Sequence, residues 1–531
     1  MSQPEDSAAA RREVLKFALA LAAITWFVLF LSDGFVLFSR PLWVDEVIAA
    51  LIASRPSPVA VIGDLGAGAD GGASLFHLSL WALRRLTGSL APALLRSLML
   101  ASVLGTLVLV YAVLRREFTR GAASAGALAI GANGLVIEHS YDARFYGPWL
   151  LACATLAWLL SRRNRYPLRR NGIALGVVAF AMCTIHFYGI ITLGLMTTGA
   201  IVAGGGEWRE RARRMAPAAW GLLALLVVVP LAFAQRNAYS VPSWLPDFQW
   251  PQLTELLRQL WLARIPLAAA FIMVCFTAVN ALRPAMGIKL ASLRRALEDP
   301  GIAALAALGI LPLALTTLSL AGQPSMLARY AIPAVLVWGP WVAIAGTFLG
   351  RWLLAAAHVV IVAFWFIGYT RVTADKNAFA QSVAAHRSAL QTVRAEHPAV
   401  PVAFASMHVM YATVWPDHLD DARAAFLEVD DATFGRWFPD STAVGQANRG
   451  VILERDLTRA HARRMGFPRL LRREVLDTTP VFFVQGAVSR LPIGFASAEH
   501  YMKSMFPAHS VRRLHADLLL LERSIGSPTR D

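Results

Sequence analysis

The sequence predicts a mainly α-helical, polytopic membrane protein with one small α/β domain after its last span. Of its 531 residues, 56% are hydrophobic and only 16% are charged, whereas soluble domains carry about 25% charged residues. Apolar runs long enough to cross a hydrocarbon core of about 30 Å recur up to residue 370. Residues 371–531 are polar and mixed in character, which indicates a folded domain outside the membrane.

About eleven apolar runs are expected to span the membrane. Basic clusters occupy alternate connections between them, starting with Arg11 and Arg12 in the tail 1–14. Because Lys and Arg concentrate in cytoplasmic loops, we expect a cytoplasmic N-terminus and residues 371–531 on the opposite side. The net charge of +16 is spread over these clusters, so nucleic acid is not an expected partner. The runs lie near residues 15–36, 96–114, 122–140, 145–160, 172–186, 187–204, 215–234, 265–282, 300–320, 331–349 and 352–370.

Two apolar segments on the outer side are expected to lie in the membrane interface. Residues 73–87, within the outer loop 37–95, are too short to span and contain charged side chains. Residues 250–261 place apolar side chains at helical spacing and have tryptophan at both ends. Both patterns are typical of amphipathic interfacial helices.

A glycine-rich stretch, residues 63–72, precedes the first of these segments. Glycines cradle a phosphate only where a helix N-terminus is suitably placed. We therefore expect a mobile loop, and we assign neither of its acids, Asp64 and Asp70, to a functional site.

The C-terminal domain is expected to begin near residues 371–376. A helix is predicted over 420–428, among four short apolar runs typical of strands. No catalytic motif is visible in this domain, so its expected role is acceptor recognition. The predicted strands are residues 402–406, 451–454, 481–485 and 518–521.

Two adjacent carboxylates, Asp45 and Glu46, directly follow the first predicted span. An acid at the bilayer centre costs about 2.5–3.5 kcal/mol and is usually functional. At the membrane boundary a carboxylate can stay ionised and still face a lipid-borne substrate. Asp45 is interpreted as a general base, a role that contributes roughly 10²–10⁴-fold to a rate. The alternative is that Asp45 caps a helix beginning at Val47, and Glu46 is interpreted as structural or as a metal or substrate contact.

A second charged cluster, Glu138 to Arg144, lies between two predicted spans. The guanidinium of Arg144 matches phosphate oxygens in a bidentate manner. Asp142 is interpreted as a group that orients Arg144, binds sugar hydroxyls or positions an acceptor, and Tyr146 follows on the next helix. The alternative is an interfacial salt bridge flanked by aromatic side chains that reach the interface.

Single candidates follow on the same outer face. His186, in a turn between two spans, is interpreted as a phosphate contact, a metal ligand or a proton donor, or as a structural histidine. Arg329, followed by Tyr330, lies at the outer end of a span and needs an anion from elsewhere. A lipid-linked phosphate or one of the acids above would supply it. Arg236 and Arg258 are weaker phosphate candidates.

The order of these features resembles the GT-C glycosyltransferase superfamily, in particular bacterial membrane transferases related to protein O-mannosyltransferases and aminoarabinose transferases. The resemblance covers roughly residues 12–370. Relatives commonly show Pro-Pro-Leu-Tyr-Tyr after the acidic loop, where this chain has Ala73-Ser74-Leu75-Phe76-His77, so its donor cavity is expected to differ. The matching features are Asp45-Glu46 after the first span, Leu94-Leu95-Arg96-Ser97 leading into a span that ends with Tyr111 to Phe118, Tyr141-x-Ala143-Arg144-x-Tyr146, and Arg329-Tyr330.

This resemblance implies an inverting transferase that uses a polyprenyl-phosphate sugar as donor. Asp45 would be the base, with Asp142 as a second catalytic residue, and Arg144 and Arg329 would steady the departing phosphate. The acceptor is expected to be a lipid, a glycan or a protein. The implied site also contains substrate-binding side chains at Glu46, Tyr146, His186 and Tyr330.

The expected location is a bacterial inner membrane, with the chemistry on the periplasmic side. No metal ligands are assigned, although a divalent metal stays open as a cofactor. Two other functions stay open: a transporter or flippase of lipid-linked saccharides, and a non-catalytic envelope scaffold. A transporter is expected to show paired repeats and broken helices at the membrane midplane, and neither is visible in the sequence.

Overall fold

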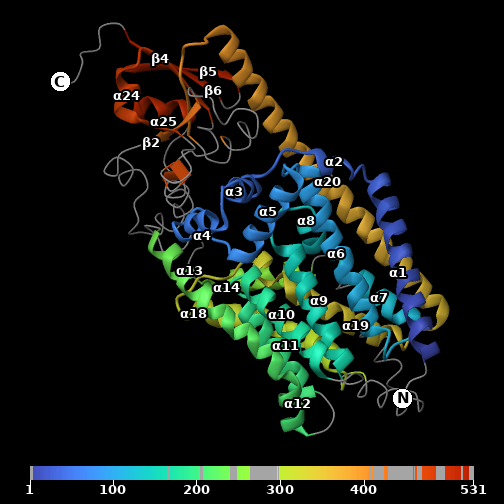
Figure 1. Ribbon diagram of the computed structural model, residues 1–531. Coiled ribbons are helices and arrows are strands. Elements are labelled where there is room, and N and C mark those ends of the chain that lie inside the picture. Colours follow the sequence, from blue (N-terminus) through green and yellow to red (C-terminus); the bar gives the residue numbers. More distant parts are fainter. Residues whose placement is uncertain are drawn as a thin grey trace.

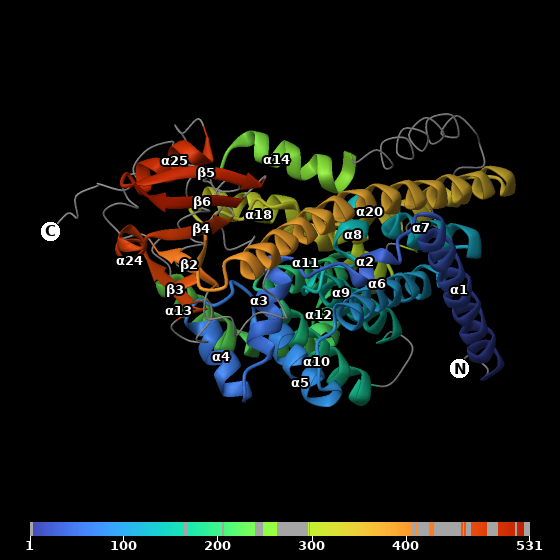
Figure 2. The ribbon, with the colours of Figure 1, turned by 90° about the horizontal axis from the view of Figure 1, so that it is seen from above.

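A bundle of helices and a mixed sheet at one end of it make up the structure (Figure 1). The long helix α20 (Arg351–Glu396) connects them, running along the bundle and ending beside the sheet (Figures 1 and 2). The computed structural model describes residues 4–163, 168–203, 207–238, 248–262, 296, 298–405, 410, 424–428, 458–459, 461–462, 469–485, 497–515 and 518–524.

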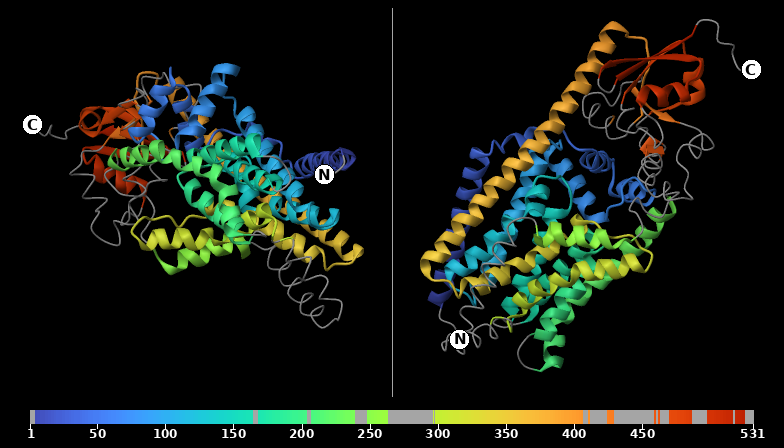
Figure 3. Two further views of the ribbon diagram at one scale, coloured as in Figure 1. Left: turned by 60° about the horizontal axis from the view of Figure 1, so that its bottom comes forward. Right: turned by 180° about the vertical axis from the view of Figure 1, so that it is seen from behind.

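Most described residues before α20 are helical. Short helices follow the first long helix, and the bundle helices come after them; Figure 3 shows the bundle from two further sides. In chain order the elements are α1 (Pro4–Leu31), α2 (Val36–Ser39), α3 (Val44–Ala53), α4 (Pro58–Gly66), α5 (Ser74–Thr87), α6 (Pro92–Leu114), α7 (Arg120–Gly131), α8 (Gly134–His139), α9 (Tyr146–Arg163), α10 (Leu168–Ile185), α11 (Gly189–Ala203), α12 (Trp208–Met215), η1 (Ala216–Ala224), α13 (Leu225–Ala238), α14 (Trp250–Leu257), η2 (Arg258–Leu262), α17 (Pro300–Ala307), η3 (Leu308–Ile310), α18 (Leu311–Leu320), η4 (Ala328–Val337) and α19 (Trp338–Gly346).

Within the described residues, six helical segments are long and apolar enough to cross a membrane. Many of their large apolar side chains are exposed, as expected for surfaces that face lipid rather than water. The polytopic helical fold predicted from the sequence is therefore confirmed. The six segments are Ala8–Leu31, Pro92–Leu114, Trp208–Ala238, Pro300–Leu320, Ala328–Gly346 and Arg351–Glu396.

Of the other expected spans, 145–160 corresponds to the uninterrupted helix α9 and others to shorter or interrupted helices, so the expected count of about eleven is not confirmed. Residues 122–140 form α7 and α8, which are separated at Ala132 and Asn133. The side chain of Asn133 accepts from the amide of Leu135 (3.0 Å) and so caps α8. The apolar helices Asn171–Ile185 and Gly189–Ala203 are shorter than a full span. The expected run 265–282 lies outside the described residues.

The two expected interfacial segments form helices, α5 and α14 with η2. The glycine-rich stretch 63–72, expected to be a loop throughout, is a loop only after residue 66. Its first part belongs to α4, which begins at Pro58 with the Ser57 side chain accepting from the amide of Ala60 (3.2 Å). Asp64 is buried on α4 and pairs with Arg55 (2.7 Å). A Ser-Pro helix start is a sufficient local signal for this helix.

The C-terminal residues form a six-stranded mixed sheet of order β3-β2-β1-β4-β6-β5. Its first four strands in this order are parallel, and β6 pairs antiparallel with both β4 and β5. The helix predicted over 420–428 is wrong, because Ala424–Glu428 is strand β2 between β1 and β3; tertiary pairing overrides its alanine-rich composition. The expected strand 451–454 lies outside the described residues. The elements are β1 (Val402–Phe404), β2 (Ala424–Glu428), β3 (Arg469–Arg472), α24 (Arg473–Thr478), β4 (Val481–Gln485), α25 (Ala498–Met505), β5 (His509–His515) and β6 (Leu518–Arg523).

The polypeptide has no break at the expected domain boundary, 371–376. Helix α20 continues without interruption to Glu396. The reason is local, because residues 371–396 contain neither glycine nor proline, and Pro398 follows shortly after the helix end. The turns of α20 directly after residue 370 line the wall of the bundle cavity, whereas its last turns pack on the sheet, with Leu390 and Val393 in the same hydrophobic cluster as Phe404 and Phe483.

The sheet packs directly on the short helix that carries the acid pair. One hydrophobic cluster contains Val47 and Ile52 of α3 together with Phe404 of β1 and Phe483 of β4, all nearly inaccessible to solvent. Leu65 of α4 joins the same cluster. Burial of each such side chain contributes roughly 1.5–3 kcal/mol. The C-terminal sheet and helix α3 thus share one core, which fixes the position of α3.

A candidate active-site cavity

The first residues of α3 lie at a cavity of about 750 Å³. Its wall contains residues from α3, from the α7–α9 region, from η2 and η4, and from α20, so segments far apart in the sequence meet there. Arg, Lys, His, Asp and Glu side chains make up just over half of this wall. They are Arg40, Asp45, Glu46, Glu138, His139, Asp142, Arg144, Arg258, Arg329, Arg371, Asp375 and Lys376.

Glu46 begins helix α3 by capping it. Its Oε2 accepts from the backbone amide of Trp43 (2.7 Å), which is the residue before the first helical turn. An acid at this position also interacts favourably with the positive end of the helix dipole. The alternative that Asp45 caps the helix is therefore wrong, because α3 starts at Val44 and the capping carboxylate is that of Glu46.

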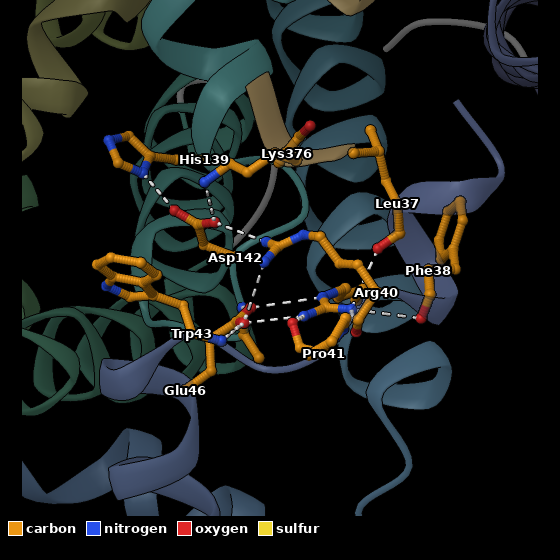
Figure 4. A network of polar contacts seen from close by, with 12 residues as sticks. Leu37, Phe38, Arg40, Pro41, Trp43, Glu46, His139, Asp142 and Lys376 are labelled. Atoms are coloured by element: carbon orange, nitrogen blue, oxygen red, sulfur yellow. Dashed lines mark hydrogen bonds and ion pairs between the residues drawn. The ribbon is translucent and has the colours of Figure 1, made fainter. Parts of the chain in front are cut away.

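Both carboxylate oxygens of Glu46 are engaged by buried partners (Figure 4). Arg96 on α6 donates from Nη2 to Oε2 (2.9 Å), and the amide of Ala143 donates to Oε1 (2.8 Å). Arg40 approaches Oε2 at 3.5 Å. We call Glu46, Arg96, Arg40 and the backbone amides of Trp43 and Ala143 the Glu46 network. Since its acceptors are occupied, Glu46 holds α3 to α6 and to the segment before α9.

Arg96 is the most heavily used side chain of this network, and the sequence did not single it out for a role. It is fully buried. Its guanidinium also donates to four backbone carbonyls, two within α2 and two in the residues directly after it. A buried guanidinium is tolerated only when its donors are satisfied in this way. The four acceptors are the carbonyls of Leu37 (3.1 Å), Phe38 (3.4 Å), Arg40 (2.5 Å) and Pro41 (3.0 Å).

Asp142 lies between three cationic or donating groups at the cavity (Figure 4). Its carboxylate contacts His139 Nδ1 (2.8 Å), Arg40 Nη2 (3.3 Å) and Lys376 Nζ of α20 (3.5 Å). Burial opposes its ionisation, but the His139 hydrogen bond and the charges of Lys376 and Arg40 hold the pKa of Asp142 well below its usual range. The expected pairing of Asp142 with the Arg144 side chain is not observed; only a backbone hydrogen bond joins them.

Asp45, Arg144 and Arg329 meet in the cavity, as the sequence predicts. Arg329 Nη1 lies 3.8 Å from Asp45 Oδ2, and Arg144 Nη1 donates to the backbone carbonyl of Asp45 (3.0 Å). The Asp45 side chain is 32% exposed, which separates it from the buried acids around it. We call Asp45, Arg144 and Arg329 the Asp45 face. It presents one accessible carboxylate between two guanidinium groups.

Asp70 is a site residue that the sequence did not identify. It accepts from Arg144 Nη1 at Oδ2 (2.8 Å) and from Arg144 Nη2 at Oδ1 (3.3 Å), and His77 Nε2 lies 2.9 Å from Oδ2. Burial opposes its ionisation, but the Arg144 charge and the His77 hydrogen bond hold the pKa of Asp70 well below its usual range. The only local signal was an acid within a glycine-rich stretch, which does not reveal a partner 74 positions away.

The aromatic candidates form a cluster beside the two guanidinium groups. The ring of His186 is stacked on Trp149 with a centroid separation of 4.2 Å, and Tyr330 lies 5.7 Å from it. Burial, together with the charges of Arg144 and Arg329, lowers the pKa of His186 to about 3, so its imidazole is neutral. Its Nδ1 accepts from the amide of Tyr188 (3.2 Å).

Tyr146 and Arg258 line the cavity. The Tyr146 ring lies 4.5 Å from that of His139. Arg258 forms an exposed pair with Glu255 on the preceding turn (2.5 Å), and Arg236 lies in the last turn of α13. Among the described residues, no group of three or more His, Cys, Asp or Glu side chains is arranged to hold a metal ion.

The comparisons with known proteins agree with this architecture. No protein-family model matches the chain, and no curated protein sequence matches it. Solved structures of ArnT from Cupriavidus metallidurans do match. The structure bound to undecaprenyl phosphate has 12% identity and a TM-score of 0.54, covering 95% of this chain and 100% of ArnT. The apo structure has 13% identity and a TM-score of 0.56, covering 94% and 98%.

This likeness covers the helical bundle and the C-terminal sheet together, so it concerns the arrangement of the whole chain and not a single motif. At this level of identity it establishes the fold alone. It agrees with the order of motifs from which the resemblance was drawn. The chain therefore has the fold of the GT-C glycosyltransferases.

Proposed function

We propose that the protein is a membrane glycosyltransferase that moves a sugar from a polyprenyl-phosphate carrier to an envelope acceptor. The observation that supports this most strongly is the Asp45 face: an accessible carboxylate lies beside two guanidinium groups in one cavity at the base of the sheet domain. The sugar, and whether the acceptor is a lipid, a glycan or a protein, are outside this proposal. The cavity is proposed to face the periplasm of a bacterial inner membrane.

The proposed step is a direct displacement at the anomeric carbon. Asp45 takes the proton of the acceptor hydroxyl while the acceptor oxygen attacks that carbon from the face opposite the carrier. The bond between the anomeric carbon and the phosphate oxygen breaks, and the carrier departs as polyprenyl phosphate with the electron pair. Arg144 and Arg329 are placed to bind the phosphate as its negative charge grows. The configuration of the sugar is inverted.

Asp142 is proposed to act in the same cavity, through the groups that it holds. Its carboxylate fixes His139 and Lys376 at the wall formed by α8 and α20. Tyr146 lines the cavity and is proposed to contact the sugar or the phosphate. His186 and Tyr330 are not in the cavity wall, but they are proposed as further substrate contacts because Tyr330 lies 5.9 Å from the Arg329 guanidinium and 5.7 Å from His186. Glu46 is a positioning residue in this proposal, since its oxygens are occupied by protein donors.

The decisive variant is Asp45→Asn. In a strain that lacks the gene, glycan and lipid profiling identifies the modified product, and the wild-type gene is expected to restore it. We expect Asp45→Asn to reach normal membrane levels but to lower the rate of transfer about 10²–10⁴-fold, since a general base contributes that much. Glu210→Gln is a matched control, because it removes an exposed carboxylate on α12 that only pairs with Arg214.

Full product formation by Asp45→Asn would rule out Asp45 as the general base. Loss of saccharide transport with intact sugar transfer would favour a transporter of lipid-linked saccharides. A gene deletion that changes neither the glycans nor the lipids of the cell would favour a non-catalytic envelope scaffold.

The phosphate site is tested independently with undecaprenyl phosphate as a ligand. Purified protein in phosphatidylcholine nanodiscs is expected to bind it, and Arg329→Gln is expected to weaken this binding about tenfold or more, because a hydrogen bond to a charged group contributes about 1.5–3 kcal/mol. Unchanged affinity in Arg329→Gln would remove Arg329 from the phosphate site.

A further inference from the structure

A buried chain of three charged or titratable groups lies behind the cavity. Arg144, which faces the cavity, is paired with Asp70, and Asp70 is contacted on its other side by His77 of α5. His77 is fully buried, and Asp70 and Arg144 are each less than 9% exposed. The three groups are therefore in an environment of low dielectric, where charges interact strongly.

Both ring nitrogens of His77 face acceptors that cannot donate. Nδ1 lies 3.1 Å from the backbone carbonyl oxygen of Ala73, and Nε2 lies 2.9 Å from Oδ2 of Asp70. A carbonyl oxygen only accepts, and an ionised carboxylate only accepts. A neutral imidazole carries one N–H and would leave one of these contacts without a hydrogen. Both contacts are hydrogen bonds only if both nitrogens carry a proton.

We propose that His77 is an imidazolium, and that the buried triad His77–Asp70–Arg144 carries one net positive charge toward the phosphate of the lipid carrier. This inference rests on the proposed function and deepens it. Without the second cation, Asp70 would cancel the charge of Arg144 before any phosphate arrived. With a positively charged His77, Asp70 can hold Arg144 in place while the three groups together keep one net positive charge. His77 and Asp70 are thus positioning residues that act through Arg144.

A second histidine of the chain shows why the geometry of His77 is informative. His358 on α20 also contacts the carbonyl four residues earlier, with Nδ1 2.7 Å from the oxygen of Leu354. Its Nε2, however, lies 2.7 Å from the hydroxyl of Ser124, which can donate or accept. The Ser124 hydroxyl also lies 3.0 Å from the carbonyl of Gly121; when it turns its hydrogen to Nε2 instead, a neutral His358 satisfies both of its contacts, whereas neither acceptor that faces His77 can donate.

Among the described residues, the acids nearest the triad each have a cationic partner of their own, although the Asp45 carboxylate also interacts electrostatically with Arg144. Asp64 on α4 is paired with Arg55, and Glu46 on α3 is paired with Arg96. Asp45 contributes its backbone carbonyl to Arg144, while its carboxylate lies nearer Arg329. The side chains of His77, Asp70 and Arg144 together carry two positive charges and one negative charge.

The loop that carries Asp70 is held by two hydrogen bonds from other parts of the chain. Gln235 of α13 donates to the carbonyl of Gly72 (2.9 Å), and His461 donates from Nε2 to the carbonyl of Ala69 (2.6 Å). Burial lowers the pKa of His461, so it serves as a neutral donor. At Gly72 a Cβ atom would lie 2.8 Å from Cε1 of His77, so the absence of a side chain there allows the histidine to approach.

The residues that complete the triad lie close together in the chain. His77 is only seven positions after Asp70 and contacts it directly. Gly72 lies between them and leaves room for the His77 ring. This short segment and Arg144 therefore form one contact unit.

The protonation state is tested directly by nitrogen-15 NMR of histidine-labelled protein in nanodiscs at pH 7.5. The chain has 12 histidines, so the signal of His77 is assigned by substitution. We expect one imidazolium signal with two protonated nitrogens, which is lost in His77→Gln and kept in His358→Gln. Absence of any such signal in the wild-type protein would overturn the proposal without the need for a variant.

The consequence for the carrier is tested with undecaprenyl phosphate. Glutamine can still donate one hydrogen bond to Asp70 but carries no charge, so His77→Gln is expected to weaken binding about tenfold, the effect of one unit charge at this depth. His358→Gln is the matched control and is expected to bind normally. Gly72→Ala, which displaces the His77 ring, is a second variant and is expected to weaken binding in the same direction.

The outcomes separate this inference from the proposed function. If the wild-type protein does not bind undecaprenyl phosphate, the proposed function fails, while NMR still reports the state of His77. If the wild type binds and His77→Gln binds equally well, the proposed function stands and the charge of His77 has no role. If His77→Gln does not fold, Gly72→Ala and the wild-type spectrum decide.

Discussion

Asp45 and Glu46 are neighbours in the chain, yet they belong to two different regions of the cavity. The Glu46 side chain is 1% exposed and accepts hydrogen bonds only from the protein. The Asp45 side chain is 32% exposed, and its nearest cation, Arg329, is 3.8 Å away. One carboxylate is used to build the helix start, and the other is left accessible beside two guanidinium groups.

This difference shows that saturation by partners, and not residue type, separates a structural acid from a candidate catalytic one. A helical residue points about 100° away from its predecessor, so adjacent acids face different surroundings. Glu46 faces α6 and the Ala143 amide, and Asp45 faces the cavity. The Glu46 network and the Asp45 face are therefore expected to respond differently to mutation.

The largest effect on stability is expected from breaking the Glu46 network at Arg96. Arg96→Ala leaves a buried Glu46 and several backbone carbonyls without their donor, and loss of one partner of a buried pair costs about 3–5 kcal/mol. The measurement is the thermal unfolding midpoint in nanodiscs together with the membrane level of the protein. Arg513→Gln, which breaks an exposed pair with Glu499 in the sheet domain, is the control. A normal midpoint for Arg96→Ala would contradict this account of the network.

A smaller effect is expected at Asp142, which lies between the two regions. Asp142→Asn removes the charge that balances Arg40 and Lys376, and we expect a loss of about 1.5–3 kcal/mol of stability, the contribution of a hydrogen bond to a charged group. Transfer activity should fall as well, because His139 loses its fixed orientation. Comparison with Lys376→Met sharpens the assignment: if Asp142 acts by holding α20, both variants should lower the unfolding midpoint.

Asp70 is expected to make the stability of the folded protein depend on pH in acid. The pKa of Asp70 is held below its usual value of 3.8 in the folded protein, so the stabilisation is present above that value and is lost as the pH falls below it. The slope is about 1.4 kcal/mol per pH unit for one carboxyl group. Unfolding midpoints between pH 5.5 and pH 3 should therefore fall less steeply in Asp70→Asn than in the wild type. Parallel curves would show that Asp70 is not selectively stabilised as an ion.

The smallest effect is expected at Arg258. This residue lines the cavity, but its side chain is 57% exposed and its pair with Glu255 faces solvent. Exposed pairs contribute little to stability, because water and salt screen their charges. Arg258→Gln should leave both the unfolding midpoint and the affinity for undecaprenyl phosphate almost unchanged. A tenfold loss of affinity would extend the phosphate site to η2 and would enlarge the Asp45 face.

Several parts of the fold were predictable because their signals are local. The long apolar helices, strands β1, β4 and β6, and the helical nature of residues 74–87 all follow from composition and periodicity. Residues 424–428 were wrongly predicted to be helical, and the continuation of α20 past the expected boundary at 371–376 was not predicted. In β2 the pairing with β1 and β3 outweighs an alanine-rich sequence, and in α20 the change in polarity after residue 370 does not interrupt a run of helix-forming residues.

The sequence by itself determined a polytopic helical protein whose outer connections contain Asp45, Arg144 and Arg329, because hydrophobic length and the distribution of basic residues act along the chain. Only the tertiary structure decided which acid each cation meets: Arg96 with Glu46, Arg40 and Lys376 with Asp142, and Arg144 with Asp70. These partners are far apart in sequence, and the pairing is set by the packing of helices that bring them within hydrogen-bonding distance. No pattern along the chain records that packing.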